Sequence, residues 1–104
     1  VIIVGTIPTI TAGRPSQGSK LYAPIPTAIQ VAAVDREDDP IQFEILLDGQ
    51  IVLPWTSGNS YTWSPALTDL GVHAIEARVQ DAFGGFESKQ VQVYVVRPPI
   101  PPPQ

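Results

Sequence analysis

The residues of this chain best suited to chemistry are carboxylates, most of which gather in one short segment. They are Asp35, Glu37, Asp38, Asp39 and Asp81. Calcium takes six to eight oxygen ligands, including carboxylates and backbone carbonyls, so the sequence predicts these five residues as candidate calcium ligands. The other interpretation is that aspartates before Pro40 and Gly84 stabilise turns and keep the loops hydrated.

Aromatic residues suggest carbohydrate binding as a second chemistry, because flat rings stack on sugar rings. Tyr61 and Trp63 would share one face of a short strand, and we expect both of them in the core. Trp55 follows Pro54 at a predicted strand end, where we expect an exposed ring. Trp55 is therefore the candidate carbohydrate-binding residue.

His73 is the only histidine, and no serine or carboxylate stands in a motif that would pair it with a nucleophile or a base. The chain has no cysteine, which excludes a thiol nucleophile, a thiolate metal site and a disulfide. Paired carboxylates on so small a domain lack an evident substrate cleft. The sequence predicts a protein that is not an enzyme.

The formal charge of -4 is unevenly distributed, because residues 35–48 contain six acidic residues and one arginine. The six lysines and arginines of the whole chain form no basic run, which argues against a nucleic-acid partner. No apolar run is long enough to cross a bilayer, so we expect no membrane insertion. The first residues show no charged-then-apolar leader, and we expect the chain to be a piece of something larger.

Two strands that alternate in polarity are predicted near the carboxyl end. Residues 73–81 place His73, Ile75, Ala77 and Val79 on one face, and residues 90–95 repeat the pattern with three valines. Gly84-Gly85 between them can adopt positive φ angles. The two strands are expected to pair as a hairpin.

Four further strands are predicted upstream of that hairpin. They cover residues 29–33, 41–47, 50–53 and 61–63. Asp48-Gly49 favours a tight hairpin turn between the second and third of these. The prolines at positions 8, 15, 24 and 26 leave several edge-strand arrangements open for the first forty residues.

No segment of helical length carries apolar residues at three-and-four spacing, and twelve prolines would interrupt most helices. About seven short strands in about a hundred residues predict an all-β fold, a two-sheet sandwich with Greek-key connections. A closed small barrel is the structural alternative. In the sandwich, the loops after residues 33 and 81 lie at the same end, where their carboxylates would converge.

Three segments carry a family resemblance. PTITAG is similar to an opening strand, AVDREDDPIQFEILLDGQ to an acidic loop, third strand and turn, and TDLGVHAIEARVQDAFGG to a turn, a strand and a V-x-D-x-x-G-G close. Through them, residues 8–96 resemble polycystic-kidney-disease-type and bacterial immunoglobulin-like domains. The resemblance implies an immunoglobulin-like Greek-key β-sandwich and an extracellular or cell-surface location.

Within the last segment, DLGVHAI resembles the D-x-G-x-Y-x-C corner of immunoglobulin folds. His73 stands in the tyrosine place and Ile75 in the cysteine place. The resemblance implies that the imidazole ties down the adjoining connection with a hydrogen bond, while Ile75 fills the core in place of a disulfide.

The ends of the sequence suggest a tandem array. RPPIPPPQ predicts an extended polyproline-type spacer over residues 97–104, and VIIVGTIPTI echoes the VYVVRPPIPP that leads into it. We expect residues 1–6 to be a linker or the end of a preceding module, with an added edge strand as the alternative, and residues 7–96 to be the domain. The tail could instead be a ligand for proline-recognition domains.

The sequence thus predicts a non-catalytic module of a larger secreted or cell-surface protein, acting as a spacer or as an adhesion element. Its expected partners are neighbouring domains and a protein or glycan ligand. A calcium- or carbohydrate-binding accessory domain of an extracellular enzyme is the alternative, and a viral structural protein could use the same module.

Overall fold

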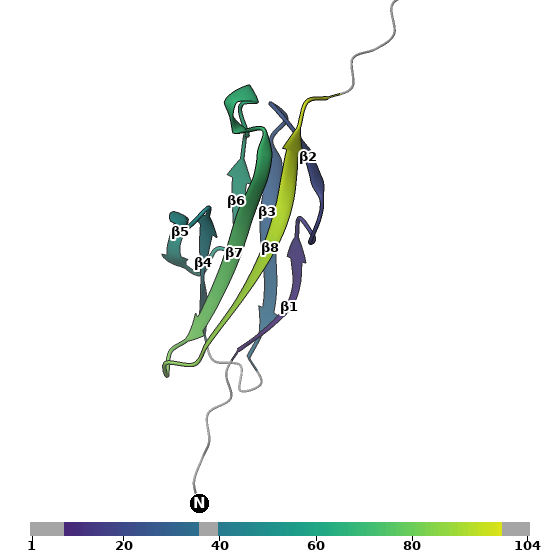
Figure 1. The fold of residues 1–104 in the computed structure, drawn as a ribbon. Coiled ribbons are helices and arrows are strands. Elements are labelled where there is room, and N and C mark those ends of the chain that lie inside the picture. Colours follow the sequence, from purple (N-terminus) through teal and green to yellow (C-terminus); the bar gives the residue numbers. More distant parts are fainter. Residues whose placement is uncertain (1–7, 36–39, 99–104) are drawn as a thin grey trace, which may run out of the picture.

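The computed structural model describes residues 8–35 and 40–98, which form two packed β-sheets (Figure 1). The smaller sheet has the order β1-β3-β6, with β1 at Thr9–Arg14, β3 at Thr27–Val34 and β6 at Ser60–Trp63. None of the helices in the described residues is both long and apolar enough to cross a membrane.

The larger sheet has the order β2-β8-β7-β4-β5. Its strands are β2 (Lys20–Tyr22), β4 (Ile41–Leu47), β5 (Gln50–Thr56), β7 (Gly71–Asp81) and β8 (Phe86–Val96). A single 3₁₀ turn, η1 (Leu67–Asp69), lies between β6 and β7. The predicted all-β sandwich is confirmed, and two separate sheets rule out the closed barrel.

The predicted strands and hairpins are all present, and β4 has the predicted bounds. In the β4–β5 hairpin, Asp48 has a φ of 52° and Gly49 a φ of 83°, the two left-handed residues that a tight turn of this kind requires. The sequence did not predict β2. This strand has three residues and pairs in parallel with the end of β8, a partner distant in the sequence.

The core lies between the sheets, where the inward-facing residues of every long strand meet. Ile45, Val79 and Val93 are completely buried, and Trp63 closes the core from β6. Ile75, Ala77 and Val79 occupy the core face of β7, as the alternation predicted. Because the described core is apolar and the chain has no cysteine, packing and sheet hydrogen bonds stabilise the fold without a disulfide.

The outer face of the larger sheet departs from simple alternation. Glu44 and Leu46 point outward on β4, yet both are buried. The pairing of β4 with β5 contains two register shifts, which bend an edge strand away from its partner. The Trp55 ring of β5 consequently reaches Phe86 of β8, although β4 and β7 lie between these strands in the sheet. The curled β5 thus covers part of the outer face.

The described chain begins and finishes at opposite ends of the sandwich (Figure 1). β1 starts at the end that holds the β7–β8 turn, and β8 finishes at the end where η1 lies. Between β1 and β2 the chain passes from the small sheet to the large one, so β1, β2 and β8 all run in the same direction.

Candidate functional site

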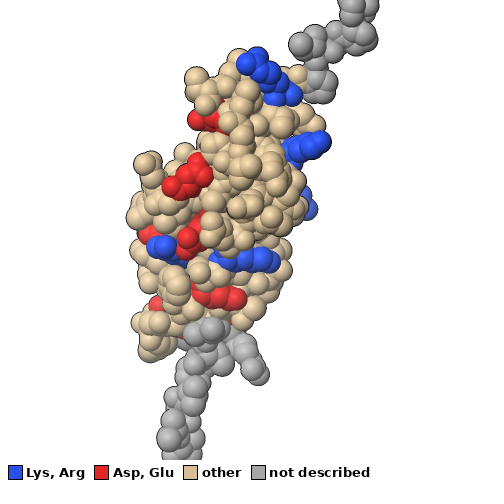
Figure 2. Space-filling view, viewed as in Figure 1, with Lys and Arg blue, Asp and Glu red and all other residues tan. Residues whose placement is uncertain are grey.

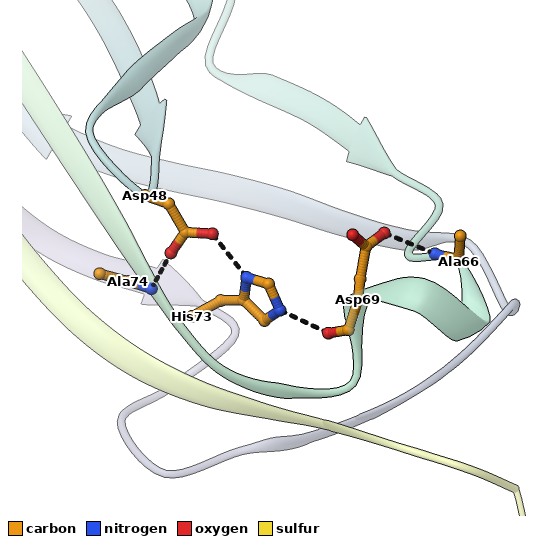
Figure 3. A network of polar contacts seen from close by, with 5 residues as sticks. All are labelled: Asp48, Ala66, Asp69, His73 and Ala74. Carbon is orange, nitrogen blue, oxygen red and sulfur yellow. Dashed lines mark hydrogen bonds and ion pairs between the residues drawn. The ribbon is translucent and has the colours of Figure 1, made fainter.

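The main polar network of the described residues lies at the η1 end and centres on His73 (Figure 3). His73 Nε2 lies 2.5 Å from the backbone carbonyl oxygen of Asp69, and His73 Nδ1 lies 2.5 Å from Asp48 Oδ2. The second carboxylate oxygen of Asp48 accepts the backbone N–H of Ala74 at 2.8 Å. One imidazole therefore joins the β4–β5 turn, the last residue of η1 and the start of β7.

Both ring nitrogens of His73 face oxygen acceptors. A carbonyl can only accept a hydrogen bond, and an ionised carboxylate can only accept as well, so the arrangement is fully satisfied by a doubly protonated imidazolium. Burial disfavours that charge, but the hydrogen bonds to Asp48 and to the Asp69 carbonyl outweigh it and raise the pKa of His73. Burial also opposes ionisation of Asp48, yet the bonds from His73 and the Ala74 amide lower the pKa of that carboxyl.

The 3₁₀ turn η1, which His73 contacts through Asp69, also has hydrogen bonds of its own. Asp69 accepts the backbone N–H of Ala66 through its carboxylate at 2.8 Å, and its own N–H donates to the Ala66 carbonyl. The indole of Trp63 packs edge-on against the imidazole, with ring centroids 5.2 Å apart. The hydrogen bond expected of the corner residue is thus present, and the structure adds Asp48 as a partner that sequence reasoning missed.

At the opposite end, the β7–β8 turn is organised by Asp81. Its Oδ1 accepts the backbone N–H groups of Phe83 at 2.9 Å and of Gly85 at 2.7 Å. A Cβ at Gly85 would lie 2.4 Å from Asp81 Oδ2, so only glycine leaves room for this carboxylate. Asp81 is therefore buried and stabilises its own turn, the alternative role considered for the acidic residues.

The calcium hypothesis stays a prediction. Asp35 directly follows β3, Asp81 is the last residue of β7, and both are buried. Glu37, Asp38 and Asp39 lie outside the described residues. Within residues 8–35 and 40–98, no three side chains of the metal-binding types form a group.

Trp55 lies within β5 and is half-buried, where an exposed ring was expected. Its indole contacts Phe86 edge-on, with ring centroids 6.3 Å apart, and Phe86 is 47% exposed. Gln80 lies opposite Phe86 in the β7–β8 ladder and opposite Gln42 in the β4–β7 ladder. Its Nε2 donates to Gln42 Oε1 at 3.2 Å. The outer face of the larger sheet therefore carries an aromatic pair next to an amide pair.

A second ionic group lies further along the same face. Arg78 Nη1 contacts Glu44 Oε1 at 3.1 Å, and Arg78 Nε contacts Glu76 Oε2 at 2.6 Å. Glu44 is buried, so the arginine compensates a carboxylate that β5 helps to seal from water. Alternation placed all three residues outward, but it could not show that Glu44 would be covered.

Comparison with known proteins gives no family assignment from sequence. No family model matches the chain, and no curated protein matches it.

Similarity appears at the level of structure. A chain of Clostridium thermocellum CbhA fibronectin(III)-like modules matches with a TM-score of 0.68 and 22% identity, over 93% of this chain and 50% of that one. The Bacteroides ovatus protein SGBP-B, solved in complex with a mixed-linkage heptasaccharide, matches with a TM-score of 0.67 and 17% identity, over 96% of this chain and 27% of that one.

The PKD domain of an M14-like peptidase from a Thermoplasmatales archaeon matches with a TM-score of 0.56 and 17% identity, over 88% of this chain and 94% of the domain. This chain spans half or less of the length of the two larger matches. The topology and these likenesses together show that the chain adopts the immunoglobulin-like β-sandwich fold.

Proposed function

We propose that this chain is a non-catalytic, immunoglobulin-like module of a larger secreted or cell-surface protein, and that it transmits tension between the parts on either side of it. The observation that carries the proposal is the course of the chain, which starts at one end of the sandwich and finishes at the other (Figure 1). A pull on both ends acts along the long strands.

The contact between β2 and β8 is suited to that load. The two strands are parallel, with Lys20, Leu21 and Tyr22 opposite Tyr94, Val95 and Val96. Gly18 donates to the Gln92 carbonyl at 2.8 Å, and Ser19 accepts from Tyr94 at 2.9 Å. A pull toward opposite ends slides β2 along β8, so these hydrogen bonds are stretched together instead of opening one after another.

Single-molecule pulling tests this proposal through the direction of force. The protein has no cysteine, so Ile25→Cys provides a unique handle just beyond β2, at the end where β8 finishes. Pulling between residue 25 and the carboxyl end peels β2 from β8, whereas pulling between the two chain ends shears them. We expect a higher unfolding force in the shear direction, because forced unfolding follows the barrier along the pulled coordinate.

Equal forces in the two directions would contradict the tension-bearing role. The matched control is Thr62→Cys, a handle on the exposed side of β6, far from the β2–β8 contact. Chemical denaturation of both cysteine variants shows whether the handle itself changes the free energy of unfolding.

A second candidate function is glycan binding on the outer face of the larger sheet. The observation that favours it is the Trp55–Phe86 pair beside the hydrogen-bonded amides of Gln42 and Gln80. Aromatic rings stack on sugar faces, and side-chain amides offer both donors and acceptors to hydroxyl groups. The neutral polar groups suit an uncharged polysaccharide.

Affinity electrophoresis through gels containing mixed-linkage β-glucan, cellulose ethers or xylan tests this candidate. Trp55→Ala and Phe86→Ala should both abolish retardation by a retained polysaccharide. Tyr94→Ala is the matched control, because Tyr94 lies on the same face of β8 at its other end and is 40% exposed. If none of these gels slows the protein, the glycan-binding function is contradicted.

A further inference from the structure

A groove of about 140 Å³ opens between the two sheets, on the side where β1 faces the first half of β8. Its apolar lining consists of Ile10, Ile29, Val31, Ile75, Ala77 and Val91. The volume is close to that of a cavity of roughly 150 Å³ that accepts a benzene molecule. The groove therefore has room for one medium-sized apolar side chain.

Two cations lie at the rim of this groove, Arg14 at the end of β1 and Lys89 on β8. Within the part of the chain that the structure describes, neither forms an ion pair. Glu87, the nearby carboxylate on β8, accepts the backbone N–H of Ile10 at 2.8 Å. Figure 2 shows blue side chains along the side of the molecule where β2 and β8 lie. The rim favours an occupant that carries negative charge.

The backbone beside the groove is also available. In the β7–β8 ladder, alternate residues of β8 bond to β7, while the others turn their N–H and C=O groups to the opposite edge. At the end of β8 these outward groups bond to the segment around β2: Gln92 bonds to Gly18, and Tyr94 bonds to Ser19. Further back, Ser88 and Gln90 continue the same edge where β2 has not yet begun.

We propose that an extended peptide with an apolar residue between two acidic ones binds here as an added strand, in line with β2, along Ser88 and Gln90. Its apolar side chain fills the groove, and its acidic side chains meet Arg14 and Lys89. Strand addition gives affinity through main-chain hydrogen bonds, and the groove gives selectivity. The peptide comes from a partner protein and continues the edge position that β2 occupies beside the end of β8.

The competing explanation for Lys89 is protective. Inward-pointing charges on an exposed sheet edge prevent edge-to-edge association, and such a lysine needs no ligand. The two explanations predict different results. If Lys89 is only protective, replacing it leaves the affinity for peptides unchanged. If Lys89 binds the peptide, replacing it changes the affinity by an amount that depends on the charge of the peptide.

The probe is the fluorescein-labelled peptide TETITET, in which the two glutamates and the isoleucine share one face of a strand. Fluorescence anisotropy measures its binding to the complete chain, and TKTITKT and TETATET are the control peptides. We expect both controls to bind more weakly than TETITET and binding to weaken as salt is added. Backbone amide NMR should show saturable shifts at Ser88, Gln90 and residues 10–14.

Three substitutions test the site. Lys89→Glu should weaken TETITET binding roughly fivefold, the effect of reversing one exposed charge, and should restore binding of TKTITKT. Ala77→Val narrows the groove and should weaken the isoleucine peptide more than the alanine peptide. Gln90→Pro removes an edge N–H that β7 does not use, and it should abolish binding while leaving the β7–β8 ladder intact.

Lys20→Glu is the matched control, because Lys20 carries the same charge on β2 outside the groove lining. Far-UV circular dichroism and thermal unfolding verify that each variant is folded. Equal binding of all three peptides, or equal effects of Lys20→Glu and Lys89→Glu, would overturn the proposal. Amide shifts confined to the Trp55 face would overturn it as well.

Discussion

The position of His73 between two acceptors makes one residue sensitive to pH. Asp48 and the Asp69 carbonyl contact its two ring nitrogens, and Trp63 covers its edge. Asp69 is the other carboxylate nearby, and it bonds to the Ala66 amide. The second proton of the His73 imidazole, which allows both ring nitrogens to donate, is therefore bound more strongly in the folded protein than in the unfolded chain.

The free energy of unfolding should depend on pH through this pair. The raised pKa of His73 contributes stability that is complete below its unfolded value of 6.5 and is lost as pH rises through the folded pKa. The lowered pKa of Asp48 contributes stability above its unfolded value of 3.8, which is lost as pH falls through the folded pKa. Stability from the pair is greatest between the two.

Guanidinium unfolding at a series of pH values checks this expectation with His73→Phe, which keeps a ring against Trp63 but removes both hydrogen bonds. We expect the variant to lose about 1–2 kcal/mol near pH 6 and less above the folded pKa. Because His73 is the only histidine, its imidazole proton signals give the folded pKa directly. A pKa below 6.5 would contradict the assignment.

Gly85 is the second residue whose identity the structure explains. Gly85→Ala forces a Cβ to within 2.4 Å of the Asp81 carboxylate, and we expect a loss of about 1–3 kcal/mol in the free energy of unfolding. Gly58→Ala is the control, because its Cβ would meet only Thr56 at 3.8 Å. That variant should stay within about 0.5 kcal/mol of the parent protein. Equal losses would show that the Asp81 contact is unimportant.

Sequence reasoning found the individual residues of these sites more readily than their partners. The corner resemblance identified His73, and the hairpin signal identified Asp48 as a turn residue, but nothing local connects them. Their contact depends on the pairing of Leu47 with Ile75, which sets the β4–β5 turn beside the start of β7. Sequence reasoning likewise identified Trp55 but not its partner Phe86. Their contact depends on the curl of β5, which follows from register shifts in the β4–β5 pairing.

Among the elements, long strands were predictable and short ones were not. β7 and β8 each have eleven residues and alternate clearly, so their local pattern determines their assignment. β2 has three residues between proline-containing segments, and its pairing with β8 is wholly non-local. Its strand conformation follows from a tertiary contact that no local pattern encodes.

The Trp55–Phe86 contact should couple β5 energetically to β8. In a double-mutant cycle of Trp55→Ala and Phe86→Ala, we expect a coupling energy of about 0.5–1.5 kcal/mol, as is usual for edge-on aromatic pairs. Urea unfolding of the four proteins provides the measurement. Strict additivity would show that β5 is held over the sheet by other contacts, such as those around Leu46.

At the scale of the molecule, stability depends on one thin core without a disulfide. Ile45→Val removes one methylene from a completely buried site, and we expect a loss of about 0.5–1.5 kcal/mol. For a domain of this size the thermal midpoint should fall by roughly 4–8 °C per kcal/mol. For Ile45→Val, a larger fall in the thermal midpoint would indicate that the site cannot relax around the lost group. Calorimetry of the parent protein with and without reductant should give the same midpoint.

The irregular edge strand β5 has a consequence for association between copies of the module. Pro54 lies on this edge of the larger sheet and lacks the N–H that a neighbouring strand would need, while the register shifts bend the edge out of plane. Identical copies held close together on one polypeptide would otherwise be exposed to edge-to-edge aggregation. The irregular β5 edge would prevent such pairing, so it would allow many copies of the module to follow one another in a single polypeptide without aggregating.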